Sequence, residues 1–347
     1  MAEGFISARA RIKVNGRWRD DLAEVVDALT VSRPLHGMAH AELRVVCWGA
    51  ANDAQGPDYQ FMDIALGDEV QIAFGQAPEV EVFTGDLTAI EERYGEGAPH
   101  LVFLLADRLH RLARHRQSRS YDQQSPDDLV NAVAAAASLQ GDPRVGGAPA
   151  TWHQLNESDL AFLFRVLYPF GIALRQAGSN LRARPEEPDP EPVPLDTTDN
   201  ALKVRLIADL NHQPRATAVR GYDAAADQAV HGSAQRTTEP GQGTTAAAEL
   251  GRLGWTSDEL VPQPAAAQQA QAASYAQGHF DRQARAFVTG DIQCIGDPRL
   301  AGGREIELRG TTRRLAGRYR VVHCVHSFDS TNGYRTQLRV SRAAWEP

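Results

Sequence analysis

The last quarter of the chain, residues 287–342, constrains the fold most, because alternating polar and apolar residues recur there between glycine-rich turns. Residues 304–309 alternate strictly, which is typical of a strand with one buried face. Asn332 and Gly333 form a hairpin-turn signal. The strands flanking this turn each place four residues on one face: Tyr319, Val321, His323 and Val325 before it, and Tyr334, Thr336, Leu338 and Val340 after it. The pattern predicts a small antiparallel barrel or sandwich.

Residues 5–105 have the same β-rich character. Alternation recurs at residues 8–14 and 69–75, and Asn15-Gly16 is a turn signal after the first of these runs. Residues 100–106 are typical of a buried strand. We therefore expect a first β unit at this end of the chain.

The segment between the two β units predicts helices and a hairpin. Ser125 is an N-cap candidate for a helix that should stop near Gly141. Asn156 is the predicted start of a second helix, and Gly171 is its C′ candidate. Residues 172–184 then form a predicted hairpin.

The region after residue 184 changes character three times. Residues 185–194 carry five prolines among acidic residues, which is typical of an extended linker. Residues 201–207 and 216–221 are predicted strands that return to the second barrel. Residues 265–285 are rich in Ala and Gln and predict a helix within an insertion at 232–283.

Several motifs, in this order, resemble the phage late control protein D family, which includes the hub portion of VgrG spike proteins. The matching stretches are G-D-x-V-x-I at 67–72, V-F-T-G-x-L-T-x-I at 82–90, Q-x-N-x-S-D-x-x-F-L at 154–163, G-D-P-x-L-x-G-G-R-E-I-x-L-x-G at 296–310, G-R-Y-x-V-x-x-x-x-H at 317–326 and G-Y-x-T-x-L-x-V-x-R at 333–342. The resemblance covers residues 8–342. It implies a trimer in which two similar barrels per chain present a six-fold-like ring to a tail tube and a three-fold end to a spike.

The expected fold class is α+β, mainly β, with two similar small antiparallel β-barrels, a helix-hairpin α/β domain and a partly helical insertion. The expected divisions are 1–106 for the first barrel, 107–184 for the α/β domain, 185–198 for the linker, 199–231 with 284–347 for the second barrel, and 232–283 for the insertion.

Composition narrows the class of protein. The formal net charge of −8 argues against nucleic-acid binding, which relies on basic patches. Cys47, Cys294 and Cys324 are too few and too scattered for a disulfide framework, which favours folding in a reducing cytoplasm. No run approaches about 18 apolar residues, so no membrane segment is expected, and residues 1–5 lack signal-peptide features. We expect cytoplasmic assembly, then a place in a virion or contractile particle that can become extracellular after lysis.

Candidate sites were weighed against ordinary structural roles. His323, Cys324 and His326 are the nearest approach to a metal cluster, but strand alternation places His323 opposite the other two, which favours ordinary strand residues. The basic passage at residues 108–119 is expected to form a solvated or intersubunit face. The acidic pairs at 91–92 and 186–187 are expected on the surface or in the linker. No catalytic, cofactor-binding or metal site is predicted.

The resulting hypothesis is a non-enzymatic baseplate or tail hub, a trimeric adaptor between a six-fold inner tube and a three-fold spike. Other baseplate proteins, a tape measure protein or cargo are further candidate partners; no nucleic acid or cofactor is expected. The chain ends after Trp345 without the domains that full VgrG proteins append, which favours a short form with a separate spike protein. The alternative is a cell-wall-degrading enzyme or a carbohydrate-binding module of a baseplate, which a peptidoglycan-release assay would separate from the hub.

Overall fold

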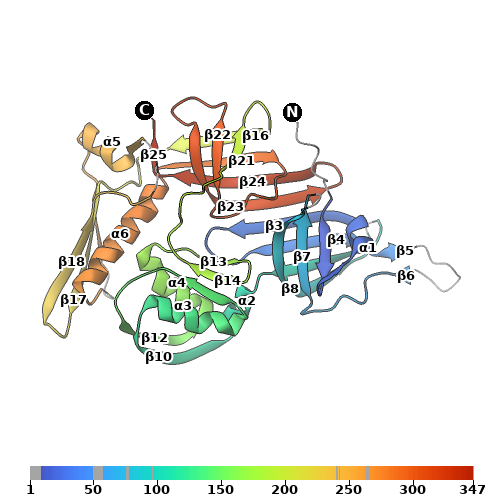
Figure 1. The fold of residues 1–347 in the computed structure, drawn as a ribbon, viewed down its shortest axis with the longest axis horizontal. Helices are drawn as coiled ribbons and strands as arrows, with labels where there is room; N and C mark the ends of the chain where they lie inside the picture. The colour runs from blue at the N-terminus through green and yellow to red at the C-terminus, as the bar shows by residue number, and fades with distance from the viewer. Residues whose placement is uncertain are drawn as a thin grey trace.

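The computed structural model describes residues 9–346 apart from 50–57, 76–77, 96, 240, 242 and 263–265. The segment 1–5, on which the absence of a signal peptide was predicted, lies outside the described residues, as does Pro347. Strands dominate, and helices gather in the α/β domain and the insertion, so the mainly β, α+β fold class is confirmed. Figure 1 shows two β modules side by side, the α/β domain below them, and the insertion to one side.

The first module is an antiparallel sheet with the order β1–β7–β8–β9–β4–β3. Its strands are β1 (Arg11–Val14), β3 (Val26–Pro34), β4 (His40–Val46), β7 (Glu69–Phe74), β8 (Val80–Arg93) and β9 (His100–Ala106). Shorter elements are β2 (Arg17–Trp18), α1 (Asp20–Glu24), β5 (Trp48–Gly49) and β6 (Asp58–Tyr59). The alternation predicted for the first strand is confirmed, because Ile12 and Val14 are buried while their neighbours are partly exposed.

The second module repeats the order of the first as β15–β22–β23–β24–β21–β16. Its strands are β15 (Val193–Asp196), β16 (Ala201–Ala208), β21 (Val288–Ile295), β22 (Glu305–Arg309), β23 (Gly317–Asp329) and β24 (Gly333–Arg342). Strands β22 to β16 pair antiparallel throughout, as β7 to β3 do. The sixth strand differs in direction: β15 runs parallel to β22, whereas β1 runs antiparallel to β7.

The closure expected of the two barrels is not seen among the described strands. Among the described strands the pairings do not close either module into a barrel, because β3 of the first module pairs with β23 of the second. The edge that would close the first module is thus used between modules. The result is a single sheet that runs through both.

The α/β domain has a two-stranded sheet, a three-stranded sheet and three short α-helices. Its elements are α2 (Leu109–Ala113), β10 (Arg116–Gln124), α3 (Pro126–Ala134), the 3₁₀ turn η1 (Ala135–Ala137), β11 (Gln140–Pro143), β12 (Ala150–Ser158), α4 (Asp159–Leu167), the 3₁₀ turn η2 (Tyr168–Phe170), β13 (Leu174–Ala177) and β14 (Asn180–Ala183). The predicted hairpin after Gly171 is confirmed as β13–β14.

The helix boundaries show where local signals were sufficient. Ser125 caps α3 as predicted, since its side chain accepts a hydrogen bond from the Asp128 backbone N–H and the Asp128 carboxylate accepts one from Ser125. The helical segment ends before Gly141, because Ser138 adopts the left-handed conformation with φ of 57°.

The predicted start of the second helix was wrong. Asn156 lies in β12 with a positive φ of 52°, and Ser158 caps α4 by accepting a hydrogen bond from the Ala161 N–H. Both residues are good caps, so composition alone could not choose between them.

The insertion and the strands just before it form a separate layer. Residues 216–221, which were assigned to the second barrel, belong to this layer instead. Strands β17 (Ala216–Asp223), β18 (Gln228–Ala234) and β20 (Asp258–Pro262) form a separate sheet, and α6 (Gln269–Arg285) packs on it. The smaller elements nearby are β19 (Thr244–Thr245), α5 (Ala246–Leu253) and β25 (Ala344–Trp345). The predicted Ala-rich helix is therefore present, and its contact layer is β17–β18.

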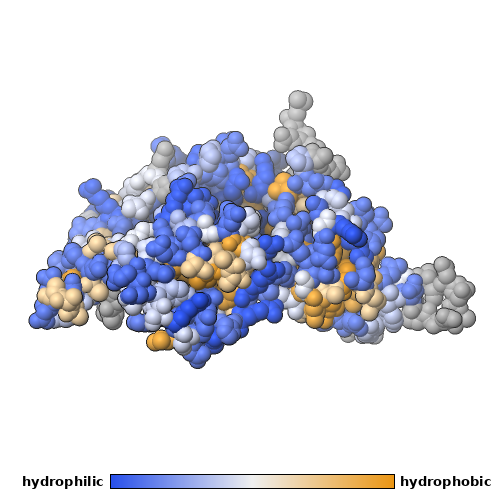
Figure 2. All heavy atoms as spheres, turned by 60° about the horizontal axis from the view of Figure 1, so that its bottom comes forward, coloured by the Kyte–Doolittle hydropathy of each residue, from blue (hydrophilic) through white to orange (hydrophobic). Residues whose placement is uncertain are grey.

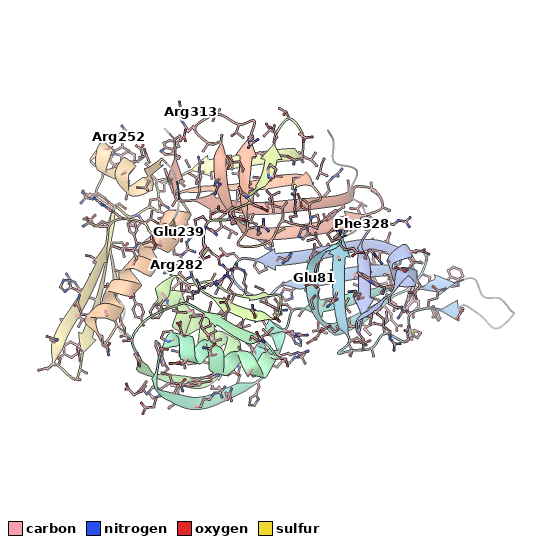
Figure 3. The ribbon with its side chains drawn as sticks, viewed as in Figure 1. Glu81, Glu239, Arg252, Arg282, Arg313 and Phe328 are labelled. Carbon is pink, nitrogen blue, oxygen red and sulfur yellow. The ribbon has the colours of Figure 1, made fainter. Side chains whose placement is uncertain are left out.

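The predicted linker 185–198 is not free along its length. Its second half contains β15, which pairs with β22, and its first half carries Glu186, whose carboxylate receives hydrogen bonds from Arg175. Figure 3 shows that α6 also faces the α/β domain, where Arg282 is labelled; the Arg282 side chain donates to the Tyr168 carbonyl at 2.7 Å. These contacts join the four parts of the molecule.

Candidate assembly edges

The two modules are equivalent residue by residue across five strands. One row of facing residues crosses the first module as Ser32, His40, Ala106, Asp86 and Glu69. The matching row crosses the second module as Ile207, Thr289, Ser341, Arg320 and Glu305. Positions in one module can therefore be translated into positions in the other.

A β-bulge follows this row in both modules. The β8–β9 ladder slips by one residue after Leu87, at Thr88, and the β23–β24 ladder slips after Val321, at Val322. Bulges bend a strand and re-aim the residues that follow. The halves of β8 and β23 beyond the bulge are equivalent, so Glu91 corresponds to Val325.

The second half of β23 is fully paired within the chain. After its pairing with β22 ends, the same edge pairs with β3 from His323 to Asp329. The Ser32 hydroxyl lies 2.8 Å from Nε2 of His323 across this junction. This junction shows how two modules of this type meet.

The equivalent edge of β8 is open. Its pairing toward β7 ends with the hydrogen bonds between Leu87 and residues 67–68. Beyond Leu87, none of the strands in the described part of the chain occupies this edge, and residues 91–93 are exposed. Backbone groups at such an edge are ready to pair with another strand.

The edge of β16, which is equivalent to the edge of β3 that pairs with β23, is also open. Strand β16, the equivalent of β3, pairs with β21 on one side and with no described strand on the other. Leu202 and Ile207 on β16 are 46% and 47% exposed. Exposed large apolar side chains on an unpaired edge mark a surface suited to association.

A hollow over the second module adjoins the open strand. It measures about 670 Å³ and is bordered by charged and polar side chains of β16, β21, β23 and β24. Asp291 lies 3.9 Å from Arg205 and 3.7 Å from Arg339. Burial lowers the pKa of His323, and the nearby positive charge of Arg339 lowers it further.

The predicted separation of His323 from Cys324 and His326 is confirmed. Cys324 and His326 are fully buried, and the His326 ring nitrogens lie 2.9 Å from the Tyr334 hydroxyl and 3.0 Å from the Leu300 carbonyl. Burial lowers the pKa of His326 to about 3. No group of metal-ligating residues occurs within the described ranges.

The predicted face of β23 is partly wrong. Tyr319 and Val321 are buried, but His323 and Val325 are not, because the extra residue at Val322 reverses the alternation. The face predicted for β24 is confirmed, since Tyr334, Thr336, Leu338 and Val340 are all buried.

Only the first part of the basic passage departs from the expected solvated or intersubunit face, since residues 113–116, 118 and 119 are exposed. Arg111 and His110 both bind the buried carboxylate of Asp86, at 2.7 and 2.6 Å. Arg108 binds Glu69. Although burial opposes ionisation of Asp86, the hydrogen bonds from Arg111 and His110 hold the pKa of its carboxyl below the ordinary value. The first part of the passage therefore docks the α/β domain onto the first module.

The acidic pairs have different surroundings. Glu91 and Glu92 lie exposed on the open half of β8. Glu186 and Glu187 lie in the segment expected as the linker, where the Glu187 side chain is exposed and the Glu186 carboxylate is buried among the side chains of Arg175, Arg182 and Arg320.

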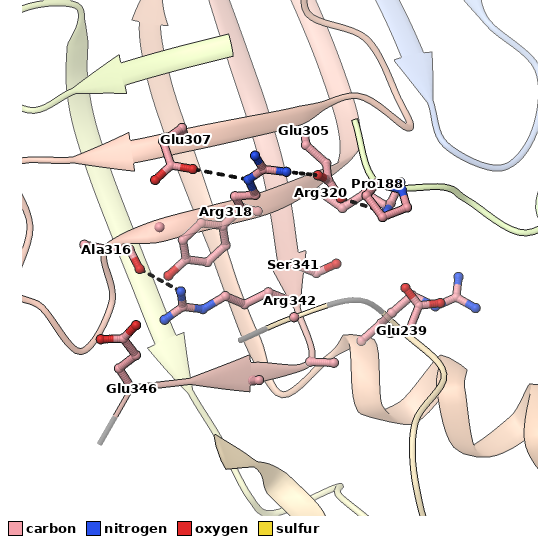
Figure 4. A pocket seen from close by; sticks show the side chains of 16 residues that line it. Pro188, Glu239, Glu305, Glu307, Ala316, Arg318, Arg320, Ser341, Arg342 and Glu346 are labelled. Atoms are coloured by element: carbon pink, nitrogen blue, oxygen red, sulfur yellow. Dashed lines mark hydrogen bonds and ion pairs between the residues drawn. The ribbon is translucent and has the colours of Figure 1, made fainter. Parts of the chain in front are cut away.

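A second charged cavity, of about 670 Å³, lies between the second module, the insertion and the last strand, as Figure 4 shows. Two ion pairs lie along its wall: Arg320 lies 2.8 Å from Glu305, and Arg318 lies 3.6 Å from Glu307. These pairs hold the wall of the cavity together.

Comparison with known proteins places the chain in a family. The model of the Alg8 N-terminal domain matches residues 7–330. The chain belongs to the Alg8 N-terminal domain family. No curated protein matches this Alg8 N-terminal domain protein.

Solved structures share its fold. The 43 kDa tail protein of prophage MuSo2 from Shewanella oneidensis matches with a TM-score of 0.73 and 14% identity, over 96% of this chain and 98% of that one. A tail protein from Neisseria meningitidis matches with a TM-score of 0.68 and 10% identity, over 96% of each chain. The E. coli c3393 protein, a type VI secretion component similar to T4 tail proteins gp27 and gp5, matches with a TM-score of 0.62 and 12% identity, over 97% of this chain and 79% of that one. The Alg8 N-terminal domain thus shares its fold with these two tail proteins and with the type VI secretion component.

The open edges are the candidate assembly feature that sequence reasoning missed in this Alg8 N-terminal domain. Residues 202–206 of β16 alternate as an ordinary half-buried strand does, so no local signal distinguishes its open edge. Nothing local distinguishes the open half of β8 from its paired half. No helix among the described residues is long and apolar enough to cross a membrane.

Proposed function

We propose that the protein is a structural hub of a tail or baseplate, in which three copies arrange six equivalent β modules in a ring. The observation that carries the proposal is the duplicated sheet, with one edge of each complementary type left open. The shared fold with phage tail proteins and a type VI secretion component supports a structural role in a particle of that kind.

The contact between copies follows from the contact within one copy. Inside the chain, β3 pairs with the second half of β23. Replacing each strand by its equivalent pairs β16 of one copy with the second half of β8 in the next. Head-to-tail contacts of this type form a ring when the rotation per contact closes. Three internal and three intermolecular junctions would then alternate around it.

The internal junction also predicts the register of the proposed contact. Ser32 faces Val325 within the chain. Ile207 is equivalent to Ser32, and Glu91 is equivalent to Val325, so Ile207 of one copy should face Glu91 of the next. The other pairs of the ladder follow from this one.

The ring would act as a symmetry adaptor. Its six β modules would offer nearly equivalent positions to a six-fold inner tube. The α/β domain and the insertion occur once per chain, so they would keep a true three-fold end for a spike. Other baseplate proteins would contact the outer surface, and the role requires no chemical step.

A cysteine cross-link tests both the assembly and its register. Facing residues in antiparallel strands have Cβ atoms about 4.5–5.5 Å apart, close to the separation that a disulfide needs. A chain carrying Glu91→Cys and Ile207→Cys should yield covalent dimers and trimers on oxidation, seen on non-reducing gels. The three native cysteines are buried and leave the background low.

An off-register pair provides the matched control. Lys203 lies four residues from Ile207 along β16, about 13 Å away, so Glu91→Cys with Lys203→Cys should remain monomeric on the gel, as should each single variant. Native mass measurement of the unmodified chain should give a trimer. A folded double variant that never cross-links, or equal cross-linking of both pairs, would contradict the proposed contact.

A further inference from the structure

A cavity of about 370 Å³ lies where the two β modules, the α/β domain and the linker meet. Its walls come from the end of β3, the β13–β14 hairpin, the linker and the turn before β22. The lining includes five arginines, listed here together: Arg33, Arg175, Arg182, Arg184 and Arg304. The cavity is distinct from the open strand edges and lies within one copy of the chain.

The glutamates and the aspartate of the linker that line this cavity already pair with arginines other than Arg33. Glu186 accepts hydrogen bonds from Arg175, and Asp189 accepts one from Arg304 at 2.5 Å. Glu187 pairs with Arg144 at 3.2 Å. None of these contacts involves Arg33.

Asp107 does not neutralise the remaining charge either. Its two carboxylate oxygens accept hydrogen bonds from the backbone N–H groups of Ala39 and Leu109, at 2.7 and 3.0 Å. Burial raises the pKa of Asp107 to about 7, so a substantial fraction of this carboxyl is uncharged near neutral pH.

Arg33 is the unmatched group. Its guanidinium makes no hydrogen bond, ion pair or ring contact with any residue that the structure describes. Burial lowers its pKa, and the charge of Arg175 acts in the same direction, while Glu81, labelled in Figure 3, attracts it only from beyond ion-pair distance. Leaving a charge partly buried without a partner is costly.

Two further arginines of the lining each keep one unpaired donor, although Arg182 lies 3.4 Å from Glu186 and Arg184 lies 3.3 Å from Asp142. The Nε atoms of Arg182 and Arg184 are buried and have no acceptor within the described part of the protein. Forked guanidinium donors match the geometry of phosphate and carboxylate oxygens. A single anion with several oxygens could accept from all three side chains.

We infer that this junction cavity binds a small multivalent oxyanion, a phosphate or a polycarboxylate, with Arg33 as its principal cationic contact. Bound there, the anion would join β3, the α/β domain, the linker and the second module. It would stabilise the relative placement of these parts before the hub meets its partners.

Calorimetric titration of the full-length protein tests the inference, with inorganic phosphate in one arm and citrate in the other, each at constant ionic strength set by sodium chloride. At least one arm should show saturable binding beyond that of chloride. Arg33→Gln should raise the dissociation constant of the bound anion roughly tenfold or more, because a charge-assisted hydrogen bond contributes about 1.5–3 kcal/mol. Binding in only one arm would identify that anion class as the ligand.

The controls separate loss of the site from loss of the fold. Arg313→Gln removes an equal charge at a side chain that is 93% exposed and should bind as the unmodified protein does. Without added anion, Arg33→Gln should unfold at the same temperature or higher, since it removes an unpaired charge; Arg33→Lys, which keeps the charge without the fork, should bind with intermediate strength. Absence of saturable binding in both arms, or unchanged binding by Arg33→Gln, would overturn the inference. The cross-linking test of the ring does not depend on either result.

Discussion

At the residue scale, Asp107 couples the stability of the protein to pH. Its carboxyl lies at the start of the α/β domain and is only 4% exposed. Burial raises its pKa to about 7, whereas the unfolded chain has an ordinary value near about 3.9. Since the folded value is the higher one, this group favours the folded state fully below about pH 4, and that contribution is lost as the pH rises through about 7.

The prediction follows from that sign. Asp107→Asn removes the titration, so the free energy of unfolding of the unmodified protein, relative to this variant, should fall by up to about 4 kcal/mol between pH 4 and pH 7.5. Urea unfolding of both proteins at several pH values measures the difference. Parallel pH profiles would show that Asp107 does not titrate in this range.

Single residues also show how far the sequence could be used. Ser125 was predicted correctly as a cap because the signal is local and complete within four residues. The face of β23 on which His323 lies was predicted wrongly, since the bulge at Val322 depends on the strand that β23 meets. Arg33 carried no signal at all: a lack of partners depends on the whole surrounding cavity.

At the scale of elements, α6 and the turn at Phe170 meet through two glycines. A Cβ added at Gly278 would lie 2.4 Å from the Phe170 carbonyl carbon, and one added at Gly171 would lie 2.7 Å from the Gly278 oxygen. The backbone of the insertion therefore touches the backbone of the α/β domain. Only glycine permits this approach.

Substitutions of two helical glycines test this backbone contact, because we expect them to change the stability of the protein in opposite directions. Gly278→Ala in α6 should destabilise the protein by about 1–3 kcal/mol through overpacking. Gly251→Ala in α5, where nothing lies within 4 Å of the added carbon, should stabilise it by about 0.4–1 kcal/mol by restricting the unfolded chain. Thermal unfolding of both variants provides the comparison; destabilisation of equal size in both would contradict the contact.

Element assignment from sequence succeeded where pattern and pairing are local. The turn at Gly333 identified the β23–β24 hairpin directly. For β17, the sequence predicted a strand but assigned it to the second module, whereas the strand lies under α6. The open edges of β8 and β16 could not be predicted, because openness is a property of absent partners rather than of the strand.

At the scale of the whole molecule, the β3–β23 junction makes the two modules parts of one sheet. A core truncation in the first module, Leu43→Ala, should cost about 2–5 kcal/mol, since Leu43 is 1% exposed. If the sheet unfolds as a unit, this variant should also speed hydrogen exchange in the distant β24. Mass-spectrometric exchange measures it, and unchanged protection of β24 would indicate that the modules open separately.

The same junction has a consequence for how the protein is made. Thr30 faces Ser327, so roughly 300 residues must be translated between the two partners, which takes about 15–60 s at typical rates. Throughout that interval the edge of β3 that later pairs with β23 stays unpaired, and it can pair with a strand of a neighbouring nascent chain. The yield of soluble protein should therefore depend on how closely ribosomes follow one another along a messenger.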